Sequence, residues 1–214
     1  MELDVISGDT MRQLQRGNTD DRFTGAAMIA AALLAVFAMG LHPRGADGGL
    51  PQLVHGALMV FALTMLAGFA RYAQRLGLAG FPVMAGLVAY AVGTIANLLA
   101  ATINGFVTPA LTAGHVSREI LRLCWELNQA FAHGAVYAVS AAFALWGVEI
   151  LLRGRGRARL FGLAGLAAGA APAAILALDV IGMGDVAGAF AVYAAQLSFT
   201  VLVGACLIRH ANTA

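Results

Sequence analysis

The sequence has no lysine, little charge of either sign and only two cysteines. Charged residues make up 11% of its 214 positions, whereas a soluble domain carries about 25%. This is too little charge to cover a surface that faces water, so a soluble globular enzyme is excluded. Coiled coils and disordered chains are also excluded, because coiled coils need helices rich in Glu and Lys and disorder needs low hydrophobicity.

The motifs of well-known enzyme classes are absent as well. The chain has no His-Glu-x-x-His or Cys-x-x-Cys metal motif, no Gly-rich phosphate loop and no Gly-x-Ser-x-Gly turn. Its 13 basic residues are all arginine and are spread through loops, so no nucleic-acid partner is expected. The sequence alone does not name a reaction, and function has to be sought in the placement of the polar residues.

Hydrophobic residues dominate the chain, at 60% of positions and a mean hydropathy of +0.81. A helix needs about 20 mainly apolar residues to cross a bilayer, and six stretches qualify. We predict an all-α, polytopic membrane helix bundle with six transmembrane helices, flanked by tails at 1–22 and 209–214. Within the domain 23–208, the expected spans lie at about 23–41, 51–72, 78–107, 119–152, 159–179 and 187–208.

The arginines predict the orientation of this bundle, because basic residues near span ends stay on the cytoplasmic side. Ten of the 13 lie in the two tails or in the second and fourth loops, and the remaining three are Arg44, Arg118 and Arg122. Both termini are therefore expected in the cytoplasm, in a multi-pass protein of the bacterial inner membrane. Cys124 and Cys206 then lie at opposite faces, so no disulfide between them is expected.

Polar side chains within the spans gather in the half that this orientation places outside. An ionisable group in a span is costly unless it faces the bundle interior, pairs or binds something, so each is a functional candidate. We expect a polar pocket that opens to the periplasm. Its candidate residues are His42, His55, Asn97, Asn104, Glu126, Gln129, His133 and Asp179.

Helical spacing predicts that several of these groups converge. Glu126, Gln129 and His133 stand at i, i+3 and i+7, which places them on one stripe of a helix. Asn97 and Asn104, seven residues apart, form a second stripe on the preceding span. At 1.5 Å per residue, we expect His55 in direct or water-bridged reach of Glu126, with His133 about 10 Å deeper on the same inward face.

Imidazole and carboxylate groups in such a pocket suit a transition metal. Zinc, copper and iron accept these ligands, and three protein ligands leave a position open for water or substrate. The candidate metal ligands are His42, His55, Glu126 and His133. The alternative cofactor, haem b, would take two axial imidazoles, and only His55 and His133 lie inside spans, at depths that differ too much to be joined easily through one iron. The leading hypothesis is a metal- or haem-binding protein in redox or metal handling, with auxiliary pocket residues Asn97, Asn104, Gln129 and Asp179.

Other functions fit the same residues. An intramembrane hydrolase would use zinc-activated water on a lipid, with Glu126 or Asp179 as the base. A small transporter or accessory subunit would use His133 and the amides to line a polar path, which would have to continue through the inner half. Structural interpretations also stand, since His42 precedes a proline at the end of a helix and Glu126 can pair with Arg122, four residues earlier.

The spans are rich in glycine and alanine, which allow helices to approach closely in a membrane. Gly165 and Gly169 form a Gly-x-x-x-Gly motif in the fifth expected span. We expect this face to pack on a neighbouring helix, either within the bundle or in a second copy of the chain. The predicted partners are therefore the lipid bilayer and, through this face, a homo-oligomer or a membrane complex.

Overall fold

The computed structural model describes residues 8–41, 50–180, 183 and 186–213. Every regular element in this part is a helix, and six helical stretches are long and apolar enough to cross a membrane. The predicted all-α fold with six spans is confirmed. The elements are α1 (Gly8–Gly40), α2 (Leu50–Leu76), α3 (Phe81–Thr102), the π-helix η1 (Ile103–Val107), α4 (Thr108–Ala113), α5 (Arg118–Arg153), α6 (Arg157–Ala177) and α7 (Val186–Thr213).

The helices differ from the predicted spans mainly at their ends. Helix α1 begins at Gly8 and covers most of the predicted tail, and its apolar part extends back to Gly17. The third span consists of α3, η1 and α4 and runs past Pro109 to Ala113. The chain stays helical there because the proline lies in the first turn of α4, where its missing N–H is not needed.

Short turns join α2 to α3 and α5 to α6 at one end of the bundle. Gly77 follows α2 with a φ of 96°, a left-handed conformation that glycine adopts without strain, and Pro82 lies in the first turn of α3. We refer to this end as the arginine end and to the opposite one, where α4 is followed by α5, as the distal end. The arginine end holds Arg22, Arg71, Arg75, Arg153, Arg155, Arg157, Arg159 and Arg209.

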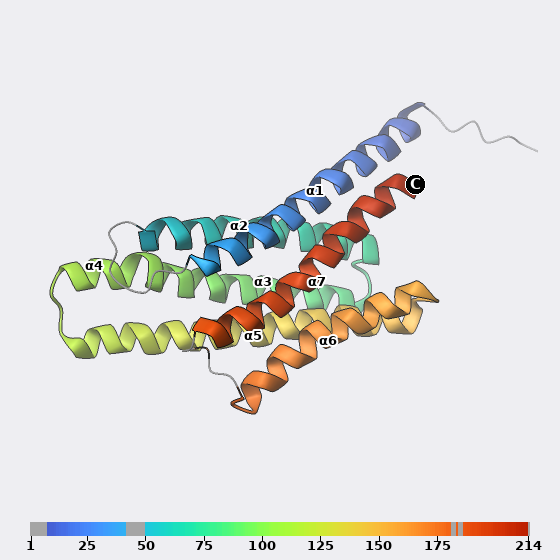
Figure 1. Ribbon diagram of the computed structural model, residues 1–214. Coiled ribbons are helices and arrows are strands. Elements are labelled where there is room, and N and C mark those ends of the chain that lie inside the picture. Colours follow the sequence, from blue (N-terminus) through green and yellow to red (C-terminus); the bar gives the residue numbers. More distant parts are fainter. Residues whose placement is uncertain (1–7, 42–49, 181–182, 184–185, 214) are drawn as a thin grey trace, which may run out of the picture.

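The contacts between the helices connect the six spans into a closed ring. Each packs against the next in the order α1, α2, α3, α5, α6, α7, and α7 returns to pack along α1. The α1–α7 pair runs obliquely to the layer of α2, α3 and α5, and both ends of the described chain lie at the arginine end (Figure 1). Gly25 and Gly204 meet where α1 crosses α7, so closely that a Cβ on either would overlap the backbone of the other.

The glycines of α6 face the inside of the same chain. A Cβ on Gly165 would contact the Phe199 ring of α7, and a Cβ on Gly169 would overlap the α5 backbone at Ser140 and Ala144. Both glycines are buried. The small-residue face that was expected to pack on a neighbouring helix packs on α5 and α7 of the same chain.

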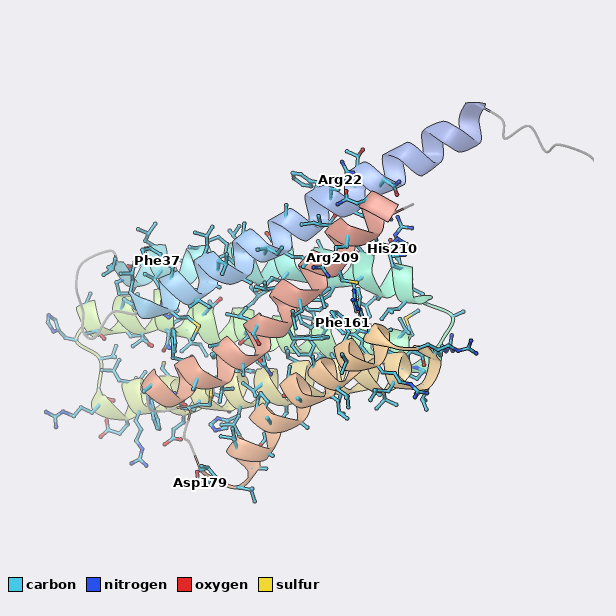
Figure 2. All side chains as sticks on the ribbon, turned by 45° about the vertical axis from the view of Figure 1, so that its right-hand side comes forward. Arg22, Phe37, Phe161, Asp179, Arg209 and His210 are labelled. Carbon is cyan, nitrogen blue, oxygen red and sulfur yellow. The ribbon has the colours of Figure 1, made fainter. Side chains whose placement is uncertain are left out.

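Aromatic side chains fill the ring toward the arginine end. Phe69 stacks on Trp146 with ring centroids 5.1 Å apart, and Nε1 of Trp146 donates a hydrogen bond to the Val83 carbonyl oxygen at 3.1 Å. Phe161 of α6, labelled in Figure 2, meets Phe199 of α7 at a centroid distance of 5.4 Å. We refer to these rings as the aromatic cluster, which consists of Phe69, Tyr72, Tyr90, Phe143, Trp146, Phe161 and Phe199.

Ion pairs connect the helices at the arginine end. Asp21 of α1 is fully buried, with Oδ1 2.6 Å from Nε of Arg71 and Oδ2 2.5 Å from Nη2 of Arg75. Both arginines belong to α2 and also donate hydrogen bonds to the Gly17 carbonyl oxygen. Glu149 forms a second pair within α5, 2.7 Å from the arginine four residues later. The ion pairs of Asp21 thus join α1 to α2 at the arginine end.

Large apolar side chains cover the outside of the ring. Val60, Val92 and Leu163 are 60%, 54% and 51% exposed, and similar residues lie on the other spans. A soluble protein rarely leaves a contiguous apolar surface of this kind in water. The chain is a multi-pass membrane protein whose outer surface faces lipid.

Candidate functional site

A cavity of about 550 Å³ lies in the distal half of the bundle. Its walls come from the α1–α7 pair on one side and from α2, α3 and α5 on the other, with η1 and α4 at the distal end. Sites for small molecules have volumes of roughly 300–1,000 Å³. Along α2 the lining runs from Pro51 to Met65, about 20 Å at 1.5 Å per residue. The cavity is therefore long for its volume.

The lining is polar in part, and its described residues carry no fixed charge. In the described part of the chain, none of the lining residues is Asp, Glu or Arg, and the imidazole of His55 is the strongest base among them. Without a counter-charge, a charged ligand would be costly to bury here. The other polar lining residues are Tyr90, Asn97, Asn104, Thr108, Thr112, Asn128, Gln129, Tyr193, Gln196 and Thr200.

An irregular turn of the third span positions His55. The His55 ring is buried, and its Nδ1 donates a hydrogen bond to the Pro51 carbonyl oxygen at 2.8 Å, which makes Nε2 the acceptor nitrogen of the neutral ring. The π-helix η1 packs against this residue at Gly105, where a Cβ would lie 2.5 Å from Cβ of His55. Glycine is needed for this approach. Single π-turns within helices are frequent at functional sites.

Hydrogen bonds from α7 connect it to α3 and α5, which form the opposite wall of the cavity. Tyr193 donates its hydroxyl hydrogen to Oδ1 of Asn97 on α3 at 2.9 Å. Gln196, one turn later, donates through Nε2 to the Val136 carbonyl oxygen and to Oγ of Ser140 on α5, at 3.2 and 3.1 Å. The bond from Tyr193 holds the Asn97 amide in place, and the NH₂ group of that amide is still able to donate.

Gln129 supplies a buried acceptor at the cavity. Its Oε1 is shielded from solvent and has no hydrogen-bond partner among the described residues, and the residue lines the cavity from α5. A buried polar atom without a hydrogen bond costs roughly 1–3 kcal/mol. A donor group on a bound molecule would recover that cost.

The inner end of the cavity is mainly apolar and aromatic, and the hydroxyl of Thr200, a polar residue there, donates to the Gln196 carbonyl oxygen at 3.3 Å. Tyr90 and Phe143, whose ring centroids lie 5.9 Å apart, belong both to the cavity lining and to the aromatic cluster. Met65 and Val139 line the same region. The polarity of the lining therefore decreases from the distal end toward the middle of the bundle.

The structure does not bring the predicted metal ligands of α5 to this cavity. Glu126 is exposed, with Oε1 3.6 Å from Nε of Arg122, and it does not line the cavity. His133 is half-buried, with Nδ1 2.7 Å from the Gln129 carbonyl oxygen, and it does not line the cavity either. Within the described residues, no three His, Cys, Asp or Glu side chains form a group that could hold a metal ion.

The remaining predicted residues divide into two groups. His55, Asn97, Asn104 and Gln129 all line the cavity. Asp179 follows α6 with a φ of 52°, is exposed just beyond the end of that helix (Figure 2), and does not line the cavity. His42 lies outside the described residues, so its role as a ligand stays a prediction.

Several lining residues were missed by the sequence analysis. Tyr193 and Gln196 are polar residues in an apolar span, one turn apart, and the rule that polar groups in spans mark functional sites would have selected them. Methionines gave no such signal, because they are equally common in apolar cores. Four of the eight line the cavity: Met39, Met59, Met65 and Met183.

No known protein family, curated protein or solved structure matches this chain. The cavity and its lining therefore carry the functional argument.

Proposed function

We propose that this membrane protein binds an uncharged, elongated, lipid-soluble molecule in its distal cavity. The observation that carries the proposal is a cavity of about 550 Å³ among five spans, lined in the described part of the chain by amides, hydroxyls and one imidazole but by no charged side chain. Apolar walls with a few polar groups are typical of small-molecule sites.

The distribution of polar groups gives the bound molecule a direction. His55, Asn104 and Gln129 lie in the distal part of the lining, and Met65 and Phe143 lie at its inner end. A polar head group placed distally would meet hydrogen-bonding partners, and an apolar tail would occupy the inner part without leaving polar groups unpaired. An amphipathic molecule fits this gradient better than a uniformly polar one.

The aromatic cluster favours a binding site over a transport path. A path would have to continue from the cavity toward the arginine end, where Phe69, Phe143 and Trp146 are almost fully buried against one another. The proposed bases of a lipid hydrolase, Glu126 and Asp179, are not among the lining residues. Both alternatives therefore have less support than binding.

The positions of the arginines support one orientation of the cavity relative to the two sides of the membrane. Because basic residues near span ends are retained in the cytoplasm, we place the arginine end and both termini in the cytoplasm. The distal cavity then faces the periplasm, in the inner membrane of a bacterium. This orientation gives a molecule in the outer leaflet the shorter route to the polar end of the cavity.

Tritiated farnesol, an uncharged linear alcohol, tests the proposal with protein purified in detergent. We expect saturable binding of about one molecule per chain. Ala62 lines the cavity from α2, and Ala62→Phe should weaken binding by about tenfold or more, because the added ring occupies the cavity.

Ala130→Phe is the matched control, since Ala130 is exposed on α5 and does not line the cavity. Its affinity should equal that of the unmodified protein. Farnesyl diphosphate, which adds charge to the same chain, should compete poorly. Equal binding by both phenylalanine variants, or stronger binding of the diphosphate, would refute the proposal.

A metal or haem is the second candidate, because imidazole and thioether groups line one cavity. Such groups bind copper(I) and haem iron, and His55 is accompanied here by Met39 and Met59. Elemental analysis and a visible spectrum of the purified protein test this candidate. About one copper or iron per chain, lost in His55→Ala, would support it, and a colourless protein free of stoichiometric metal would remove it.

A further inference from the structure

The polar groups at the distal end of the cavity share one chemical property. The amides and hydroxyls each offer both a hydrogen-bond donor and an acceptor. Carboxylates, which only accept, and guanidinium groups, which only donate, are absent from the lining in the described part of the chain. The site can therefore bind a head group that accepts hydrogen bonds in one chemical state and donates them in another.

The observed hydrogen bonds define one donor and one acceptor for such a head group. Asn97 accepts from Tyr193 through Oδ1 at 2.9 Å, so its NH₂ group can donate into the cavity it lines. Gln129 has a buried Oε1 with no partner among the described residues, so it can accept. The two residues come from α3 and α5, which pack directly on each other.

We infer that the head group is a quinone ring that binds in both its oxidised and its reduced form. The carbonyl oxygens of a quinone would accept from the Asn97 amide, and the hydroxyls of the quinol would donate to Oε1 of Gln129. This inference rests on the proposed function and specifies its ligand class.

The shape and the apolar part of the cavity agree with this class. A quinone ring with an isoprenoid or alkyl tail is uncharged, narrow and long, as the lining of about 20 Å along α2 requires. Trp125 lines the distal part, and Tyr90 and Phe143 line the inner part, so flat aromatic surfaces are available to a ring and to the first tail carbons. A simple alcohol has one oxygen atom and no ring, whereas a quinone ring has two oxygen atoms on opposite edges, which can reach polar groups on different walls of the cavity.

The inference is tested by measuring how well two probes displace tritiated farnesol. Decylubiquinone is used under oxidising conditions and decylubiquinol under reducing conditions. We expect both forms to bind about tenfold more tightly than farnesol, because each has a second oxygen for hydrogen bonding and a flat ring that can pack on the aromatic lining. Their Kd values should lie within about tenfold of one another, since the site can serve both forms.

Gln129→Met removes the acceptor and keeps the length of the side chain. It should raise the Kd of the quinol about tenfold and that of the quinone less. Gln52→Met is the matched control, because Gln52 on α2 also has a buried Oε1 without a partner in the described chain but does not line the cavity. It should leave both affinities unchanged.

The outcomes separate this inference from the proposed function. If farnesol binds and both quinone forms bind no more tightly than farnesol, the inference is overturned and the proposed function stands. Binding of only one redox form, or equal effects of the two glutamine substitutions on the quinol, would also overturn the inference. If neither farnesol nor either quinone form binds, both fail.

Discussion

At the scale of single residues, Asp21 is the most deeply buried of the charged side chains described. Its carboxylate is fully buried between Arg71 and Arg75 at 2.6 and 2.5 Å. Removing one partner of a buried ion pair leaves an uncompensated charge, at a cost of about 3–5 kcal/mol. The two arginines are 27% and 34% exposed, so water and lipid head groups reduce that cost toward its lower limit.

Asp21→Asn should therefore lower the free energy of unfolding by about 3 kcal/mol, measured as a loss of thermal stability in detergent. Asp20→Asn is the control, because Asp20 is exposed on the same helix and its substitution should change stability by less than about 0.5 kcal/mol. Equal stabilities of the two variants would show that the Asp21 pair does not stabilise the fold.

At the scale of the element, the π-turn η1 requires glycine at Gly105, where it packs against α2. A methyl group there would lie 2.5 Å from Cβ of His55 and 3.1 Å from Cγ, so Gly105→Ala has to push η1 away from α2. We expect a loss of about 1–3 kcal/mol of stability, together with weaker farnesol binding. Thermal unfolding and the binding assay measure the two effects.

Gly134→Ala provides the comparison, since nothing lies within 4 Å of a Cβ at this position in α5. Alanine is the better helix former by about 1 kcal/mol, so this variant should be as stable as the unmodified protein or more so. If Gly105→Ala were equally well tolerated, the close approach of η1 to His55 would not be a constraint on the site.

The rotation of α5 explains which predicted site residues reach the cavity and which do not. Glu126, Gln129 and His133 do share a stripe, but the cavity-facing side of the helix runs through Asn128 and Ala132. At 3.6 residues per turn, Gln129 lies near the edge of that side, and Glu126 and His133 are turned about 100° away from its centre. Spacing places residues on one face, whereas packing decides where that face points.

At the scale of the whole molecule, hydropathy was sufficient to predict the six spans, because the bilayer requires long apolar helices. The placement of His55, Asn97, Asn104 and Gln129 in one cavity also followed from the rule that polar groups avoid lipid. The walls of the cavity did not follow, since Tyr193 and Met39 come from α7 and α1, two spans far apart in the sequence that meet at Gly204 and Gly25. Those contacts depend on rotation and tilt, which a sequence pattern leaves open.

The orientation of the bundle can be tested with alkaline phosphatase, which is active only outside the cytoplasm. A fusion after Arg155, between α5 and α6, should be inactive because this turn lies at the arginine end. A fusion after Gly114, between α4 and α5, should be active. The reverse pattern would place the cavity on the cytoplasmic side and would change the proposed access route while leaving the fold intact.

The closed ring also sets the order in which the protein can be completed during synthesis. Helix α1 leaves the ribosome before the other described spans, yet its main neighbour is α7, which it meets at Gly25 and Gly204. At about 5–20 residues per second, the last span follows on the order of ten seconds later. Until then α1 lacks its partner and the cavity lacks one wall, so a chain released before α7 would already span the membrane but would have no closed site to hold a ligand.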